Sequence, residues 1–160
     1  MRLVGFMHFL QDQANEFFEK TLPESGITYE PNGRHKAYAN IADNFRHFWV
    51  MVDDEQKIVG TVAVTDLIYD SKYADILHRN SGELCCLYLS NEYKGQGLGE
   101  KMLSFAIDQA KSFGYGWLYL DTVTAKSQTG FDLYKKYGFE EIPRYNDNPY
   151  SNVCMRLKLW

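Results

Sequence analysis

Three glycines alternate with other residues in the segment Lys94-Gly95-Gln96-Gly97-Leu98-Gly99, which follows an apolar run and precedes an amphipathic one. Glycine has no Cβ, so alternating glycines allow backbone N–H groups to converge on one point. A helix that begins at the same place adds its unpaired N–H groups and the positive end of its dipole. This combination is typical of a phosphate site, and we expect Tyr93–Gly99 to hold a pyrophosphate.

Other phosphate-binding motifs fit this segment less well. A Walker loop ends in Gly-Lys-Ser/Thr, and this segment does not. A dinucleotide fingerprint has the spacing G-x-G-x-x-G early in a βαβ unit, whereas these glycines alternate strictly and lie past the middle of the chain. A glycine-rich turn that binds no ligand is the remaining alternative.

The same residues resemble the signature of the GNAT superfamily of acyl-CoA-dependent N-acetyltransferases. That family has Gln/Arg-x-x-Gly-x-Gly/Ala between its fourth strand and the next helix, and here Lys94 stands at the first position. Upstream, Leu87-Tyr88-Leu89 stands where the family has Leu-Tyr-Val. Downstream, the segment 133–139 (LYKKYGF) is similar to the family's Leu-Tyr-x-x-x-Gly-Phe. The resemblance runs from about Ile58 to Phe139 and weakly over the whole chain.

The resemblance implies that acetyl-CoA is the cosubstrate and that no metal is needed. Its contacts are expected at the end of the strand, at the glycine turn, in the first helical turn and at two positions further on. The expected cofactor-binding residues are Leu87, Leu89, Lys94, Gly95, Gln96, Gly97, Leu98, Gly99, Glu100, Ser127 and Tyr134.

Acyl transfer to an amine needs a base for the ammonium group, a donor for the oxyanion and an acid for the departing thiolate. The first candidate base is Glu83, because family members often use a glutamate on this strand and its apolar neighbours raise its pKa. His47 and His78 are alternatives by chemistry alone. The family's oxyanion donor, a backbone N–H near the bulge of the fourth strand, corresponds to Leu89 within one residue.

Tyr134 corresponds to the family position that faces the coenzyme sulfur, so the resemblance implies that it is the general acid. An ordinary phenol has a pKa near ~10, close to the ~8.5 of a thiol. Tyr137 is the nearby competitor, although it falls on a variable position of the family pattern.

Composition narrows the class of protein. The chain has 160 residues, 45% apolar and 24% charged, which suits one domain over residues 1–160. A net charge of −4 argues against nucleic acid as a partner. No apolar run approaches the ~20 residues of a membrane span, and no secretory signal is visible, so we expect a cytoplasmic protein.

Cys85 and Cys86 are adjacent, and in a strand they would point to opposite faces.

Hydrophobic periodicity predicts an α/β fold. Phe9, Leu10, Phe17 and Phe18 are expected on the core face of the first helix. We expect a GNAT-like central twisted mixed sheet of six to seven strands, flanked by helices on both faces. Strands are expected over residues 2–6, 48–52, 58–65, 83–89, 117–123, 139–142 and 153–159, and helices over 8–20, 37–45, 97–113 and 128–137.

The predicted function is transfer of an acetyl group from acetyl-CoA to a primary amine of a small molecule or peptide. A non-catalytic acyl-CoA-binding regulatory module is the alternative, and a longer acyl chain or an oxygen acceptor is a third possibility. The sequence does not name the acceptor, and the family allows a homodimer. The expected acceptor region holds Tyr29, His35, Tyr38, Phe45, Tyr145 and Asn148.

Overall fold

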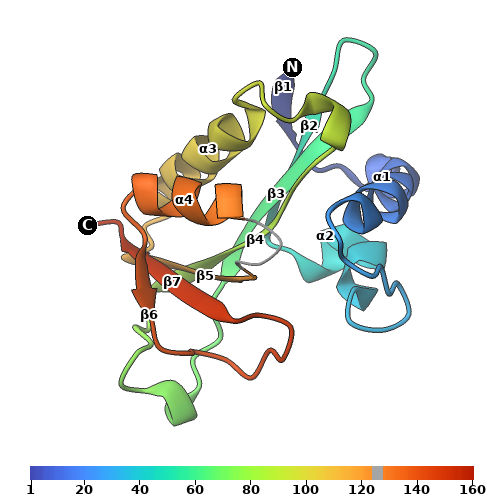
Figure 1. The fold of residues 1–160 in the computed structure, drawn as a ribbon. Helices are drawn as coiled ribbons and strands as arrows, with labels where there is room; N and C mark the ends of the chain where they lie inside the picture. The colour runs from blue at the N-terminus through green and yellow to red at the C-terminus, as the bar shows by residue number, and fades with distance from the viewer. Residues whose placement is uncertain (124–127) are drawn as a thin grey trace. The chain divides into compact units, whose positions relative to one another are not determined.

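The computed structural model describes residues 1–123 and 128–160. Within these ranges it has seven strands in one mixed sheet, with the order β1-β2-β3-β4-β5-β7-β6, and four α-helices (Figure 1). This arrangement confirms the predicted α/β class. The strands are β1 (Arg2–Gly5), β2 (His47–Val52), β3 (Ile58–Asp66), β4 (Ser81–Leu89), β5 (Trp117–Thr122), β6 (Glu140–Ile142) and β7 (Val153–Lys158). The helices are α1 (Gln11–Glu24), α2 (Ile41–Asn44), α3 (Leu98–Ser112) and α4 (Gln128–Lys136).

The chain forms two compact units. The first unit consists of Met1–Thr65 and Cys85–Ala106, and the second consists of Asp66–Leu84 and Ile107–Trp160. The single domain over 1–160 stays a prediction. In the described ranges no helix combines the length and the apolar character that a membrane crossing needs.

The first unit is built on the hairpin of β2 and β3, as the sequence predicts, with β1 paired antiparallel to β2. Side chains of β2 alternate between two apolar layers. Phe48 and Val50 belong to one buried cluster with Phe18 of α1, whereas Trp49 makes an edge contact with Phe105 of α3, at 5.2 Å between ring centroids. Helices therefore cover both faces of the sheet in this unit (Figure 1).

The start of the first helix differs from the prediction. The chain forms a 3₁₀ helix at His8–Leu10 before α1, and α1 continues to Glu24 with Pro23 in its last turn. A 3₁₀ turn has about 3.0 residues per turn, so it takes Phe9 out of the α-helical register. The expectation that Phe9 lies on the core face is wrong, because its side chain is 78% exposed.

Strand β4 carries a local irregularity at Cys86. Cys86 has φ 57°, a left-handed conformation that is rare for a non-glycine residue and that occurs at β-bulges. Thr61 Oγ donates a hydrogen bond of 2.7 Å to the Cys86 carbonyl. The expectation that Cys85 and Cys86 point to opposite faces is wrong, since both pack in the same hydrophobic cluster. The left-handed residue interrupts the alternation on which that expectation depended.

The second unit joins parallel and antiparallel strands. The parallel ladder between β4 and β5 begins with Ser81 opposite Trp117 and ends with Glu83 opposite Tyr119. β7 then pairs antiparallel with both β5 and β6. Tyr119 and Tyr145 fill a buried cluster beside these strands, and their ring centroids are 5.2 Å apart.

Candidate active site

The glycine turn has the backbone conformation that a phosphate cradle requires. Gly95 and Gly97 have φ values of 80° and 77°, which L side chains rarely adopt. A Cβ placed at Gly95, Gly97 or Gly99 would meet no atom within 4 Å, so open space lies above all three residues. The glycines are therefore set by backbone conformation and by the space that they leave, and not by packing against the protein.

The helix after the turn begins at the predicted place. α3 starts at Leu98, and Lys101 donates its backbone N–H to the Gly97 carbonyl at 3.1 Å. The amides that precede Lys101 in this first turn have no acceptor within the helix and point out of its N-terminus. This end of the helix is consequently suited to oxygen atoms of a pyrophosphate.

The residues before the turn fix its position. The Ser90 N–H donates to the Val59 carbonyl of β3 at 2.9 Å, and the Asn91 N–H donates to the Glu24 carboxylate at 3.2 Å. Lys94 and Gln96 are exposed, and Glu100 is half-buried. The structure thus fits a coenzyme pyrophosphate at the glycine turn, with exposed side chains on either side of it.

Glu83 lies in an environment that shifts its acidity. Its side chain is half-buried, and desolvation raises its pKa from 4.5 to about 7. The Tyr145 hydroxyl donates a hydrogen bond of 2.7 Å to Glu83 Oε2, which opposes this rise, and the negative charge of Asp121 adds to it. A carboxyl group with this pKa is half ionised near neutrality, which is the range in which a general base is most effective.

Tyr134 lies in α4 with its ring 5.8 Å from that of Phe139. The side chain is half-buried, and desolvation raises the pKa of its phenol to about 12. Among residues 1–123 and 129–160, the structure shows no hydrogen-bond partner for this hydroxyl. The phenol is therefore a desolvated donor that is protonated at every physiological pH.

The oxyanion donor stays a prediction. Leu89 is half-buried at the end of β4, and the irregularity of this strand lies three residues earlier, at Cys86. An N–H donor next to the irregularity would belong to Leu87, which the resemblance to the GNAT superfamily places in the expected coenzyme-binding set. Ser127 lies outside the residues that the structure describes, and its expected coenzyme contact stays a prediction.

The two candidate histidines both stack on tryptophans. The rings of His47 and Trp49 are 6.1 Å apart and nearly parallel. His78 lies 4.5 Å from Trp117 with an interplanar angle of 4°. Both imidazole rings are therefore explained by packing on a neighbouring tryptophan. Glu83 remains the first candidate for the general base.

The expected acceptor residues of the first unit form a packed aromatic group. His35 is buried, and its Nδ1 accepts a hydrogen bond of 3.0 Å from the Glu30 N–H. The hydroxyls of Tyr38 and Tyr88 are 2.9 Å apart. Phe45 packs on Tyr38 with 6.0 Å between centroids. These contacts show that the side chains of His35, Tyr38 and Phe45 pack against neighbouring residues of the first unit.

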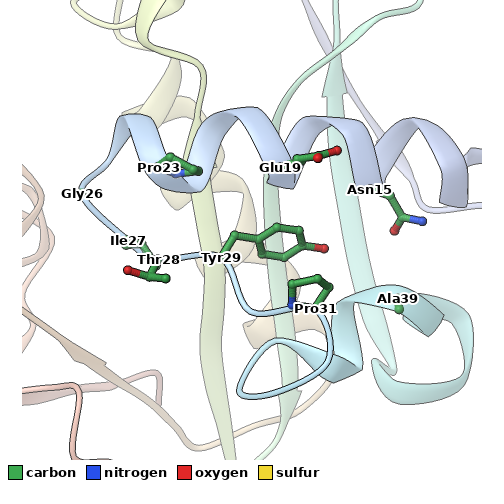
Figure 2. Close-up of a pocket in the computed structure, with 9 residues that line it drawn as sticks. All are labelled: Asn15, Glu19, Pro23, Gly26, Ile27, Thr28, Tyr29, Pro31 and Ala39. Atoms are coloured by element: carbon green, nitrogen blue, oxygen red, sulfur yellow. The ribbon is translucent and has the colours of Figure 1, made fainter.

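A groove of about 740 Å³ lies along α1 in the same unit (Figure 2). Asn15, Glu19 and Pro23 line it from the helix, and Tyr29 and Pro31 line it from the segment that follows. The groove combines apolar walls with one carboxylate, and among the expected acceptor residues Tyr29 is a lining residue.

The sequence does not indicate the hydrogen-bond partner of Glu83 or the residues that hold this partner. From the sequence, Tyr145 and Asn148 are expected only as parts of the acceptor region. In the structure Asn146 and Asn148 donate from their amides to Asp121 Oδ2, at 2.9 and 3.0 Å. The density of amide side chains in residues 145–148 was the available signal, but their partner on another strand is visible only in the fold.

The pattern of the Acetyltransferase (GNAT) family matches residues 5–139, and the chain belongs to this family. An uncharacterized N-acetyltransferase of Dictyostelium discoideum is 34% identical over 77 residues, which are 48% of this chain and 35% of that protein. The chain spans 35% to 66% of the length of the curated relatives that it matches.

Solved GNAT structures share the fold over nearly the whole chain. An acetyltransferase of Staphylococcus aureus Mu50 has a TM-score of 0.83 at 20% identity and covers 99% of both chains. The GNAT N-acetyltransferase YhbS of Escherichia coli, solved in complex with CoA, has a TM-score of 0.74 at 16% identity and covers 99% of this chain and 81% of its own. At these identities the likeness concerns the fold alone.

Proposed function

We propose that this protein transfers an acetyl group from acetyl-CoA to a primary amine of a small molecule or peptide. The observation that carries the proposal is the pair of left-handed glycines, Gly95 and Gly97, with open space above them at the start of α3. Such a turn binds a pyrophosphate through backbone N–H groups. Membership in the GNAT family supports CoA as the molecule that supplies it.

In this proposal Glu83 is the general base. An alkyl ammonium group must lose a proton before its nitrogen can attack the thioester carbonyl. With a pKa of about 7, the Glu83 carboxylate is present in quantity at neutral pH and is a much better proton acceptor than an ordinary carboxylate. The neutral amine attacks, and a backbone N–H of β4, at Leu89 or Leu87, stabilises the oxyanion.

Tyr134 assists the departure of the CoA thiolate. A phenol with a pKa of about 12 lies roughly 3.5 pH units above a thiol near ~8.5, so complete proton transfer to the thiolate is uphill by about 5 kcal/mol. A hydrogen bond from the phenol still stabilises the charge that develops on sulfur. The proposed role of Tyr134 is therefore to donate a hydrogen bond to the sulfur, while the proton stays on the phenol oxygen.

Two measurements test the proposal. Acetyl-CoA at millimolar concentration is expected to raise the melting temperature, since a ligand that binds only the folded state stabilises it. Release of free CoA is then followed across polyamines, amino acids, aminoglycosides and peptides. The absence of any thermal shift would remove the coenzyme assignment, whereas a shift without transfer to any amine would favour the non-catalytic acyl-CoA-binding module.

A further inference from the structure

The Tyr145 side chain is buried, and its hydroxyl forms a hydrogen bond with the Glu83 carboxylate. The residue is 2% exposed, and its ring packs on Tyr119. Its hydroxyl donates a hydrogen bond of 2.7 Å to Glu83 Oε2. Burial and the nearby carboxylates raise the pKa of Tyr145 far above its usual value, so the phenol stays protonated and stays a donor. A buried donor to a carboxylate fixes the orientation of that carboxylate.

The other carboxylate oxygen of Glu83 has different surroundings. Among the residues that the structure describes, Glu83 Oε1 accepts no side-chain hydrogen bond. A carboxylate offers about four lone-pair sites, so one oxygen held by Tyr145 leaves the second available to accept a proton. The contact therefore separates an anchoring oxygen from a reactive one.

The segment that carries Tyr145 is itself anchored. Asn146, Asn148 and Ser151 donate to Asp121 Oδ2 at 2.9, 3.0 and 3.3 Å. Hydrogen bonds to a charged acceptor are stronger than those between neutral groups. Three donors on the Asp121 carboxylate of β5 hold the segment that directly follows Tyr145 in place.

Among the described residues of the second unit, four titratable groups face Glu83. Tyr145 lies in the segment between β6 and β7, Asp121 and Tyr119 lie in β5, and Cys154 lies in β7. The Tyr145 hydrogen bond lowers the pKa of Glu83, while Asp121 raises it. The Tyr119 hydroxyl donates instead to the Ile76 carbonyl, at 2.6 Å. Within this set, Tyr145 is the direct hydrogen-bond donor to Glu83.

We infer that Tyr145 is a positioning residue, which holds the Glu83 carboxylate so that its free oxygen receives the proton of the acceptor amine. The inference rests on the proposed function for its chemical meaning. Its geometric part, a hydrogen bond that stabilises the ionised carboxylate, can be measured without turnover. Tyr145 itself touches no reacting atom in this scheme.

The decisive variant is Tyr145→Phe, which removes the hydroxyl and keeps the ring. Loss of the donor is expected to raise the pKa of Glu83 by about one pH unit, because a hydrogen bond to a charged group contributes about that much. The carboxyl ¹³C signal of Glu83, assigned by its disappearance in Glu83→Gln, gives this pKa by NMR titration. The acid limb of the pH dependence of kcat/KM should move up equally, and kcat/KM at pH 6 should fall about tenfold.

Tyr119→Phe is the matched control, because it removes an equally buried phenol whose hydroxyl bonds to a backbone carbonyl. Its Glu83 titration and acid limb should match those of the wild type. An unchanged Glu83 titration in Tyr145→Phe, or an equal shift in both variants, would overturn the inference. Wild-type protein that binds acetyl-CoA but acetylates no amine would overturn the proposed function, and the NMR titration would still decide the hydrogen-bond role.

Discussion

Glu83 lies opposite Tyr119 in the last residue pair of the parallel ladder between β4 and β5. Its carboxyl group is thus attached to a backbone that is fixed by sheet hydrogen bonds up to that residue. Rigid elements hold a reacting group more precisely than loops do. The partner of the carboxyl, Tyr145, comes from a segment that Asp121 anchors. Glu83 is positioned from the strand on one side and from this segment on the other.

Replacing Glu83 by glutamine should slow acetyl transfer by about 10²- to 10⁴-fold, the usual contribution of general base catalysis. The acid limb near pH 7 in the profile of kcat/KM should disappear, because this limb reports the ionisation of the base. Acetyl-CoA affinity, measured by calorimetry, should stay within a few-fold of wild type. Glu140→Gln, an exposed glutamate of β6, is the control and should keep both rate and limb. An acid limb that survives in Glu83→Gln would assign it to another group.

The raised pKa of Glu83 also predicts how the free energy of unfolding changes with pH. The folded-state pKa of about 7 lies above the ordinary value of 4.5, so the folded protein binds this proton more tightly than the unfolded chain does. The free energy of unfolding of the wild type should therefore fall relative to Glu83→Gln as pH rises from about 4.5 to 7. The difference should reach about 3 kcal/mol above pH 7, from a shift of about 2.5 pH units. Urea unfolding at pH 4, 6 and 8 measures it, and a difference that is constant with pH would contradict the raised pKa.

Tyr134→Phe should lower kcat by roughly 10- to 10³-fold and leave acetyl-CoA binding intact, because the phenol acts on the leaving thiolate. Since the pKa of Tyr134 is about 12, no basic limb from this residue is expected below about pH 10. Tyr137→Phe, one residue before the turn at Gly138, is the control and should retain the wild-type kcat. Equal losses in the two variants, measured by CoA release under saturating acetyl-CoA, would count against a specific role for Tyr134.

Gly97→Ala should weaken acetyl-CoA binding at least tenfold. The φ of 77° disfavours alanine by about 1–2 kcal/mol, and its methyl group would occupy the open space above the turn. Gly99→Ala is the matched control, because Gly99 has no positive φ and the family accepts alanine there. Calorimetry with acetyl-CoA compares the two. A Gly97→Ala affinity equal to that of the wild type would show that the pyrophosphate does not contact Gly97.

The sequence predicted the parts of the site that depend on local backbone chemistry. The glycine turn before α3 could be predicted because glycine is the residue that adopts positive φ readily, so the residue types alone indicate the backbone conformation. The strand that carries Glu83 follows from an apolar run, and the structure extends it by two residues to Ser81. In such segments local preference and tertiary structure agree.

The features that could not be predicted from the sequence depend on contacts between distant residues or on irregular backbone geometry. The hydrogen bond between Tyr145 and Glu83 joins residues 62 positions apart, and no spacing rule indicates it. Phe9 fits a helical pattern but lies in a 3₁₀ turn with a different period. Cys86 has a backbone conformation that its residue type disfavours, so the sequence gives no sign of it.

The left-handed residue at Cys86 also bears on the construction of hybrid proteins from this family. Side chains before and after it follow the alternation of a strand in different phases, so a segment exchanged across this point must keep the same number of residues on each side. A junction chosen by counting every second residue from Ser81 would place the side chains of Leu87, Tyr88 and Leu89 on the wrong faces of the sheet. Crossover points at residues 80 and 90, outside the strand, would transfer β4 intact.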